Sequence, residues 1–438
     1  MPVAGHRQSG GRLMTMQSTR SPQNPGWVLA LFLCAHTLLS IDRGVMAILA
    51  EPIKREFALS DTQVGLLTGL GFAIFFGIGG IPIGMLVDRV SRKRILAASV
   101  AVFSVMTALG GAANSFLQIL AVRSLLGAGE AGGTPSMSSI LSDLYPPEKR
   151  VRAMAIFYAG NPLGAVLAFL IGGAIAAHWG WRATFVAAAA PGLLLVPLLL
   201  ISLREPVRRT GAGRTERTAA HGLGETLRFI LRKRSLRHVV VTPILTSAAS
   251  AGVFVFASSL FLRVHGLTIA QTGLLLAVFY GMIGVIGTVI GGILLDRLTA
   301  RDERWQPWFC ALSNGTAAIG VILMALAPSF PIAVLGMSLI AVTTTATLGP
   351  LLAMLHALVA SRMRGTATAI LYFLAYLIGA GSGPWIVGLL SDQLLPTYGA
   401  DSIRYGIVVM AFLYVWGGLH FWMSARCFRD EVAHVATL

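Results

Sequence analysis

A six-residue motif occurs at the same place in each half of this chain. Residues 84–89, Gly-Met-Leu-Val-Asp-Arg, reappear as Gly-Ile-Leu-Leu-Asp-Arg at residues 292–297. The same offset relates an upstream pair, residues 59–67 and 267–275, which share Leu, Ser or Thr, Gln and Gly-Leu-Leu at matching positions. In each half a long apolar stretch joins the two motifs. A repeat of this kind predicts two homologous halves that are built mostly from apolar helices.

Apolar stretches account for most of the sequence. The chain is 55% hydrophobic and only 12% charged, whereas a soluble domain carries about 25% charged residues. Each stretch is close to the ~20 residues that a helix needs to cross a bilayer. We therefore expect an all-α membrane protein with twelve transmembrane helices in two pseudo-symmetric bundles of six. The stretches lie at about residues 27–50, 62–86, 95–113, 118–142, 152–176, 183–203, 239–262, 271–295, 308–327, 332–357, 366–390 and 404–425.

A polar and basic segment separates the sixth stretch from the seventh. It predicts a linker between two bundles, and the chain divides into an N-terminal tail (1–26), a first bundle (27–203), the linker (204–238), a second bundle (239–425) and a C-terminal tail (426–438). Two capping boxes, at residues 60–63 (Ser-x-x-Gln) and 268–271 (Thr-x-x-Gln), predict the starts of the second and eighth helices.

The distribution of Lys and Arg predicts the orientation, because cytoplasmic loops of membrane proteins are rich in these residues. With the N-terminus inside, only five of the 34 basic residues fall in outer loops: Lys54, Arg55, Arg182, Arg263 and Arg404. Both termini are therefore expected in the cytoplasm, with the protein crossing the cell membrane (the inner membrane of a bacterium). The net charge of +16 then reflects topology, so we expect a lipid bilayer and no nucleic acid as partner. We expect a monomer.

Catalytic and cofactor motifs are not evident in the sequence. The three cysteines, Cys34, Cys310 and Cys427, are far apart and lack the spacing of metal ligands. We find no nucleophile–base pair, metal cluster or phosphate-binding loop. The pattern predicts a protein that is not an enzyme and that needs no cofactor or metal.

The repeated motif and the charges that follow it indicate a gate on the inner side. Asp88 is expected to lie against the positive N-terminal end of the eleventh helix. Arg92 can pair with Asp143, and Asp296 can approach Arg152. Such contacts would hold the inner side shut in an outward-facing state; the alternative is that these charges only anchor the topology. The candidate gating residues are Gly84, Asp88, Arg89, Arg92, Asp143, Arg152, Gly292, Asp296 and Arg297.

Apart from Arg152 at the start of the fifth stretch, four charged residues fall inside the predicted helices of the first half. Asp42 and Arg43 lie in the first helix, and Arg123 and Glu130 lie in the fourth. An ionisable group inside a bilayer costs about 2.5–3.5 kcal/mol or more, which makes each one a functional candidate. Asp42 and Glu130 lie at similar depth, and Asp42 and Arg43 are adjacent and cannot pair with each other. We therefore expect Arg43 to pair with Glu130 and Asp42 with Arg123. Opening such a pair changes the pKa of its carboxylate, so we interpret the four as a proton-coupling network; a purely structural ion network is the alternative.

The second half offers a contrast, since its predicted helices contain no Asp, Glu, Lys or Arg apart from Arg404 at the outer end of the last one. A cavity between the halves would be charged on one wall and apolar on the other, which suits an amphiphile with a polar head. Small polar solutes are the alternative. The candidate substrate-binding residues are Arg43, Arg123, Thr134, Tyr158, Asn161, Tyr372 and Tyr376.

Two levels of family resemblance follow from these motifs. GMLVDRVSRKR at residues 84–94, with its second copy, resembles the signature loop of the major facilitator superfamily. Within the first five helices the chain is similar to Spinster-type transporters. That similarity is carried by residues 41–43 (Ile-Asp-Arg), 61–67 (Asp-x-x-x-Gly-Leu-Leu), 123–131 (Arg-Ser-Leu-Leu-Gly-Ala-Gly-Glu-Ala), 135 (Pro), 143–144 (Asp-Leu) and 156–158 (Ile-Phe-Tyr).

The Spinster resemblance implies export of sphingosine-1-phosphate or lysophospholipids by alternating access, with the helix charges coupled to protons. The chain departs from the family pattern at residues 132–134 and at Asn161, near the expected cavity. Organic-anion symporters of the same superfamily share Gly-Trp-Arg-x-x-Phe at residues 180–185, so a proton-coupled symporter of a small organic anion is the alternative. A receptor or scaffold that does not transport is an alternative of another class.

Overall fold

The computed structural model describes residues 23–205, 223–360 and 363–436, and the regular structure in these ranges is entirely helical. We call the end of the bundle where the first helix begins and the last helix ends the inner end, and the opposite end the outer end. The helices of the first half are α1 (Pro25–Phe57), α2 (Asp61–Thr68), α3 (Leu70–Arg89), α4 (Arg92–Gly111), α5 (Phe116–Glu130), α6 (Gly133–Leu144), α7 (Pro147–Tyr158) and α8 (Gly160–Ser202).

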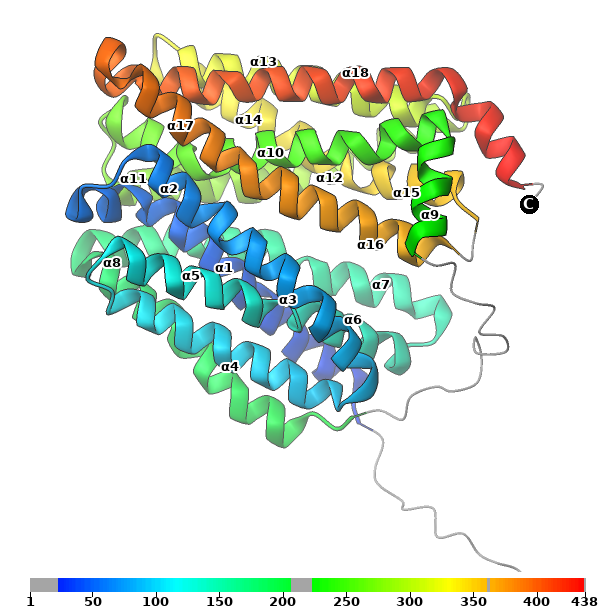
Figure 1. Ribbon diagram of the computed structural model, residues 1–438, viewed down its shortest axis with the longest axis horizontal. Coiled ribbons are helices and arrows are strands. Elements are labelled where there is room, and N and C mark those ends of the chain that lie inside the picture. Colours follow the sequence, from blue (N-terminus) through cyan, green and yellow to red (C-terminus); the bar gives the residue numbers. More distant parts are fainter. Residues whose placement is uncertain (1–22, 206–222, 361–362, 437–438) are drawn as a thin grey trace, which may run out of the picture.

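The second half begins with a short helix, α9 (Leu223–Arg232), and ends with the long α18 (Ser402–Ala436). In Figure 1, α1–α8 form the lower half of the molecule and α10–α18 the upper half. The remaining elements are α10 (Arg234–Arg263), α11 (Ile269–Leu276), the π-helix η1 (Ala277–Met282), α12 (Ile283–Thr299), α13 (Trp305–Leu326), α14 (Phe330–Ala346), α15 (Leu348–Leu358), α16 (Arg364–Leu374), the π-helix η3 (Ala375–Ala380), α17 (Gly381–Tyr398) and the 3₁₀ turn η4 (Gly399–Asp401).

Twelve crossings can be followed through the described ranges. Nine helical segments there are long and apolar enough to span a membrane. Two of them hold two crossings each: one bends at Gly180, whose φ of 78° requires glycine, and the other turns at η4. The twelfth crossing is α5 with α6, two shorter helices separated by a break at residues 131–132. The expected twelve-helix, all-α fold is confirmed, and both capping boxes form as predicted.

Helix boundaries differ from the sequence prediction near the inner end. The expected linker contains α9 and the start of α10, and the expected C-terminal tail continues α18. The reason is apolar packing, because Ile230, Leu236 and Phe428 are buried together in one cluster and such packing extends a helix beyond its hydrophobic core. Residues 1–22 of the expected tail and 206–222 of the expected linker lie outside the described residues.

The two halves pack closely where the upstream repeat lies. α2 packs on α17, and its counterpart α11 packs on α8. A Cβ at Gly65 would overlap the carbonyl oxygen of Pro384, and a Cβ at the equivalent Gly273 would overlap the carbonyl oxygen of Phe169. The repeated glycine therefore lets backbone meet backbone at both seams between the halves. From these seams the halves diverge toward the inner end (Figure 1).

Candidate functional site

Two ion pairs join α1 to α5 midway along α1. A guanidinium nitrogen of Arg123 donates to Asp42, and one of Arg43 donates to Glu130. These are the two pairings expected from the sequence. Asp42 and Arg43 are neighbours in the chain and point to different sides of the helix, so each finds its partner on α5 rather than in the other.

The two pairs differ in exposure. Asp42 and Arg123 are both buried, and Thr107 donates a further hydrogen bond of 3.3 Å to Asp42. In the second pair the side chain of Arg43 is 30% exposed, whereas that of Glu130 is only 4% exposed. Glu130 Oε2 has no hydrogen-bond partner. Because leaving a buried charged oxygen unsatisfied is costly, the Arg43–Glu130 pair is the part of the site that a proton or a ligand can most easily change.

Aromatic rings enclose the two guanidinium groups. The Phe72 ring lies 5.7 Å from the Arg43 guanidinium carbon and 5.5 Å from that of Arg123. The Tyr376 ring, on η3 of the second half, lies 5.5 Å from the Arg43 guanidinium carbon and packs at a tilt against Phe76, with ring centroids 5.4 Å apart. Such distances allow cation–π attraction. Arg43 therefore contacts both halves of the molecule.

The other substrate-binding candidates lie at varying distances from this centre. Tyr158 is 51% exposed and packs edge-on against His36 of α1, with centroids 5.6 Å apart. Asn161 accepts a 2.8 Å hydrogen bond from Ser40, and Tyr372 is 39% exposed. Thr134 is half-buried on α6 and forms no hydrogen bond with any residue of the two ion pairs.

The inner-end candidates are only partly assembled. Arg92 donates to Asp143 at 2.5 Å, as expected. Asp296 and Arg152 are both exposed and form no ion pair with each other, so that expected contact is absent from this conformation. Contacts that close the inner end need the two halves to approach there, and here they diverge. Gly292 and Arg297 lie on the same helix as Asp296. The surroundings of Gly84 and the side chains of Asp88 and Arg89 lie outside the described part of the structure.

An additional carboxylate, not predicted from the sequence, completes the Arg92 site. Glu205 accepts a 2.9 Å hydrogen bond from the backbone N–H of Arg92 and another from the hydroxyl of Ser91, at the start of α4. Burial by itself raises the pKa of Glu205, but these hydrogen bonds outweigh it and hold the pKa below its ordinary value. Glu205 thus ties the chain after α8 to the N-terminus of α4.

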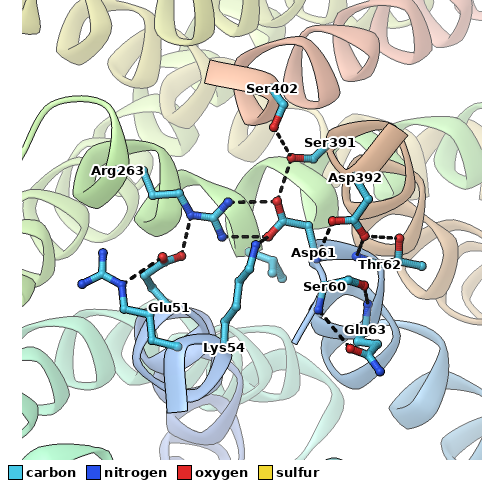
Figure 2. A network of polar contacts seen from close by, with 12 residues as sticks. Glu51, Lys54, Ser60, Asp61, Thr62, Gln63, Arg263, Ser391, Asp392 and Ser402 are labelled. Atoms are coloured by element: carbon cyan, nitrogen blue, oxygen red, sulfur yellow. Dashed lines mark hydrogen bonds and ion pairs between the residues drawn. The ribbon is translucent and has the colours of Figure 1, made fainter. Parts of the chain in front are cut away.

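A second charged network closes the outer end (Figure 2). Asp61 at the start of α2 is buried and accepts two hydrogen bonds from Arg263 of the second half, at 2.7 and 2.9 Å. Lys54 also donates to Asp61 at 2.5 Å. Arg263 uses its remaining Nε to bind Glu51 of α1 at 2.6 Å. Every ion pair between described residues of the two halves belongs to this network.

Asp392 of α17 adds a helix cap that crosses between the halves. Its carboxylate accepts hydrogen bonds from the backbone N–H groups of Asp61 and Thr62, at 2.9 and 2.7 Å, and from the Thr62 hydroxyl at 2.5 Å. Backbone N–H groups at a helix N-terminus lack partners within the helix, and a carboxylate there is stabilising. Ser391 donates to Asp61 at 2.7 Å beside it. The second half therefore holds the start of α2 in place.

Comparison with known proteins identifies the architecture. The sequence profile described as Major Facilitator Superfamily matches residues 31–384. The chain belongs to this superfamily. An MFS-type efflux pump of Mycolicibacterium smegmatis (strain ATCC 700084 / mc(2)155) is 30% identical, over 91% of this chain and 92% of that protein. The sphingosine-1-phosphate transporter SPNS2 of Danio rerio is 24% identical, over 89% of this chain and 82% of that protein.

A solved structure extends the likeness to the Spinster group. A bacterial homologue of the human lysosomal transporter Spinster, in an inward-facing and unoccupied conformation, superposes with a TM-score of 0.82 at 28% identity, over 93% of this chain and 98% of the other. This superfamily member is thus a multi-pass membrane transporter that resembles Spinster. Its outer end is closed by Asp61, Arg263 and Asp392 and its halves diverge at the inner end, so it is also in an inward-facing arrangement.

Sequence reasoning missed the outer network of this superfamily member. The sequence pattern places Lys54 and Arg263 in outer loops as basic residues, and Asp61 in a family motif, without pairing them. The available signal was the concentration of acids and bases at helix ends that are otherwise apolar: Glu51, Asp61 and Asp392 face the same side of the membrane as the two cations. Their pairing depends on how the two halves dock, which cannot be predicted from the local sequence pattern.

Proposed function

We propose that this superfamily member is a proton-coupled, alternating-access transporter of an amphiphile with an anionic head, of the sphingosine-1-phosphate or lysophospholipid type. The observation that carries the proposal is the Arg43–Glu130 pair. Its carboxylate is buried with one oxygen unpartnered, and its guanidinium is partly exposed between the halves. An ion pair in this setting can open when its carboxylate takes up a proton, which couples protonation to ligand binding.

The cycle follows from the charges. When Glu130 is ionised, it neutralises Arg43. When Glu130 takes a proton, Arg43 loses its counter-charge and becomes a binding site for an anionic head group, which guanidinium binds in a bidentate manner. Deprotonation returns the carboxylate to Arg43 and releases the head group. Asp42 and Arg123 stay paired in the buried layer beneath and keep the net charge of the site balanced.

The remaining candidates take supporting roles in this proposal. Tyr376, with Tyr158 and Tyr372, would line the path of the head group, and Asn161 and Thr134 would contact it from the first half. The second half supplies an uncharged wall for the hydrocarbon tail. The likeness to a sphingosine-1-phosphate transporter and to a Spinster homologue supports an amphiphile as substrate.

We assign the inner end to the cytoplasm, in line with the abundance of Lys and Arg expected there. Both termini then lie in the cytoplasm of a cell-membrane protein that acts as a monomer. Arg92 and Asp143, with the two copies of the repeated motif, would form the inner gate. The Asp296–Arg152 contact would form when the halves close at that end.

A small organic anion is the second candidate substrate. The two guanidinium groups flank one aromatic ring, Phe72, and so lie near each other in the first half. Paired arginines of this kind suit a carboxylate. The same proton step at Glu130 would then serve a symporter of small anions.

Uptake into proteoliposomes tests the proposal. A labelled lysophospholipid is supplied with and without an imposed pH gradient to the wild type, to Glu130→Gln and to Glu56→Gln. Glu56 is the matched control because its pair with Arg182 is exposed. We expect gradient-driven flux in the wild type and the control, and its loss in Glu130→Gln.

Two outcomes would contradict the proposal. Equal gradient-driven flux in Glu130→Gln would remove this residue from coupling. Absence of lysophospholipid flux in a protein shown to be folded would reject the amphiphile, and gradient-driven uptake of labelled glucuronate would then favour the small-anion alternative.

A further inference from the structure

A groove runs along the exposed side of the second half, away from the transport site. It lies between α13 and α18 and has a volume of about 460 Å³, within the ~300–1,000 Å³ typical of small-molecule sites. Its floor is formed by small residues: a Cβ at Gly315 would touch nothing, and Gly418 lies close to α13. Trp305, Trp308 and Trp422 line its inner end. Large apolar side chains are thus left exposed along an open channel.

Arginine side chains lie at the tryptophan end of this groove. The Arg426 guanidinium lies 4.5 Å from the Trp422 ring, and that of Arg304 lies 5.2 Å from the Trp308 ring. Arg304 is paired with Asp302 at 2.8 Å. Arg426 is exposed and forms no ion pair with any residue that the structure describes. Cation–π stacking orders the Arg426 side chain while its charge remains available to an anion.

The distance from the far end of the groove to Arg426 matches one leaflet of a bilayer. Val415 lines its far end, and Arg426 lies eleven residues further along α18, or about 16 Å at 1.5 Å per residue. Half of a ~30 Å hydrocarbon core is about 15 Å. Tryptophans are typical of the membrane–water boundary, which places Arg426 at the level of the lipid phosphates.

We propose that this groove binds one membrane phospholipid, with an acyl chain along Gly315, Gly418 and Leu419 and the phosphate on Arg426. The chemistry is that of a phosphodiester and a hydrocarbon chain. A general aromatic belt would need neither the glycine floor nor the stacked arginine. The site is independent of the proposed transport function, because none of its residues belongs to the transport site.

Native mass spectrometry of the full-length, delipidated protein tests this proposal. Phosphatidylglycerol, phosphatidylethanolamine or diacylglycerol is added back to the wild type, to Arg426→Gln and to Gly315→Leu. The matched controls are Arg94→Gln, an exposed arginine at the inner end of the first half, and Gly349→Leu, another helical glycine beside open space. We expect the wild type and both controls to retain one phospholipid of either head group and no diacylglycerol.

Loss of that single adduct in Arg426→Gln and Gly315→Leu supports the site. Unchanged retention in both variants, or equal retention of diacylglycerol, would overturn it. A dimer that only these two variants dissociate would also overturn it, since a second copy of the chain would then be the occupant. Thermal unfolding of each variant establishes that it is folded before the adducts are compared.

Discussion

Removing the cap that crosses between the halves should open the outer end of the transporter. In Asp392→Ala, the backbone N–H groups of Asp61 and Thr62 lose the carboxylate that accepts from them at 2.9 and 2.7 Å. The cap exists only while the outer end is closed, because its donors and its acceptor lie on different halves. The substitution therefore destabilises the inward-facing state and leaves the outward-facing state nearly unchanged.

The magnitude follows from the value of a helix cap. Loss of a capping side chain costs about 0.5–2 kcal/mol. Ser60 still caps Gln63 of the same helix, so only part of the N-terminus is left without a protein partner and water can enter. We expect about 1–2 kcal/mol, which changes the ratio of inward-facing to outward-facing molecules by about 5–30-fold.

Pulsed electron paramagnetic resonance measures the distance between two spin labels and can determine this ratio. Spin labels are placed at Asn114→Cys and Ala400→Cys, exposed outer-end positions on the two halves, after the three native cysteines are replaced by serine. The population at long distance should rise in Asp392→Ala. Asp401→Ala is the matched control, since Asp401 is an exposed outer-end acid that pairs with Arg404 within its own half. An unchanged distribution in Asp392→Ala, or an equal change in the control, would refute the reasoning.

Three further substitutions test other parts of the structure. Gly65→Val adds a Cβ where α2 meets the backbone of α17, so the same spin labels should report an outward shift that the open-space variant Gly349→Val does not produce. Asp42→Asn leaves the charge of Arg123 buried without a counter-charge, and thermal unfolding in detergent should show a loss of about 3–5 kcal/mol; an unchanged unfolding temperature would contradict the pairing. Glu205 has a pKa below its ordinary value, so its stabilisation is present above the unfolded-state pKa of about 4.3 and lost as pH falls through the lower folded-state value. Glu205→Gln should therefore unfold at a lower temperature than the wild type at pH 7, and this difference should shrink as pH falls below about 4.3; a constant difference would reject the charge as its cause.

The helical crossings could be read from the sequence because bilayer thickness fixes their length and lipid excludes exposed backbone polar groups. The starts at Ser60 and Thr268 were predictable for a local reason, since a capping box is complete within four residues. The inner ends of α10 and α18 were not, because their last turns are held by contacts such as that of Phe428 with residues distant in sequence.

The pairing of Arg43 with Glu130 was also predictable, because charges at equal depth in adjacent crossings have few other partners in lipid. The outer network was not. Whether Asp61 meets Arg263 depends on the angle between the two halves, which no local sequence pattern fixes. The absent Asp296–Arg152 contact has the same origin.

The sequence by itself thus determined the number of crossings, the two-fold repeat and the four charges within the helices, since each follows from local hydrophobicity, spacing or the cost of charge in lipid. Only the tertiary structure decided which end is closed and which residues close it. Those contacts join residues more than two hundred positions apart, such as Asp61 and Arg263, and they exist only when two rigid halves dock at a particular angle.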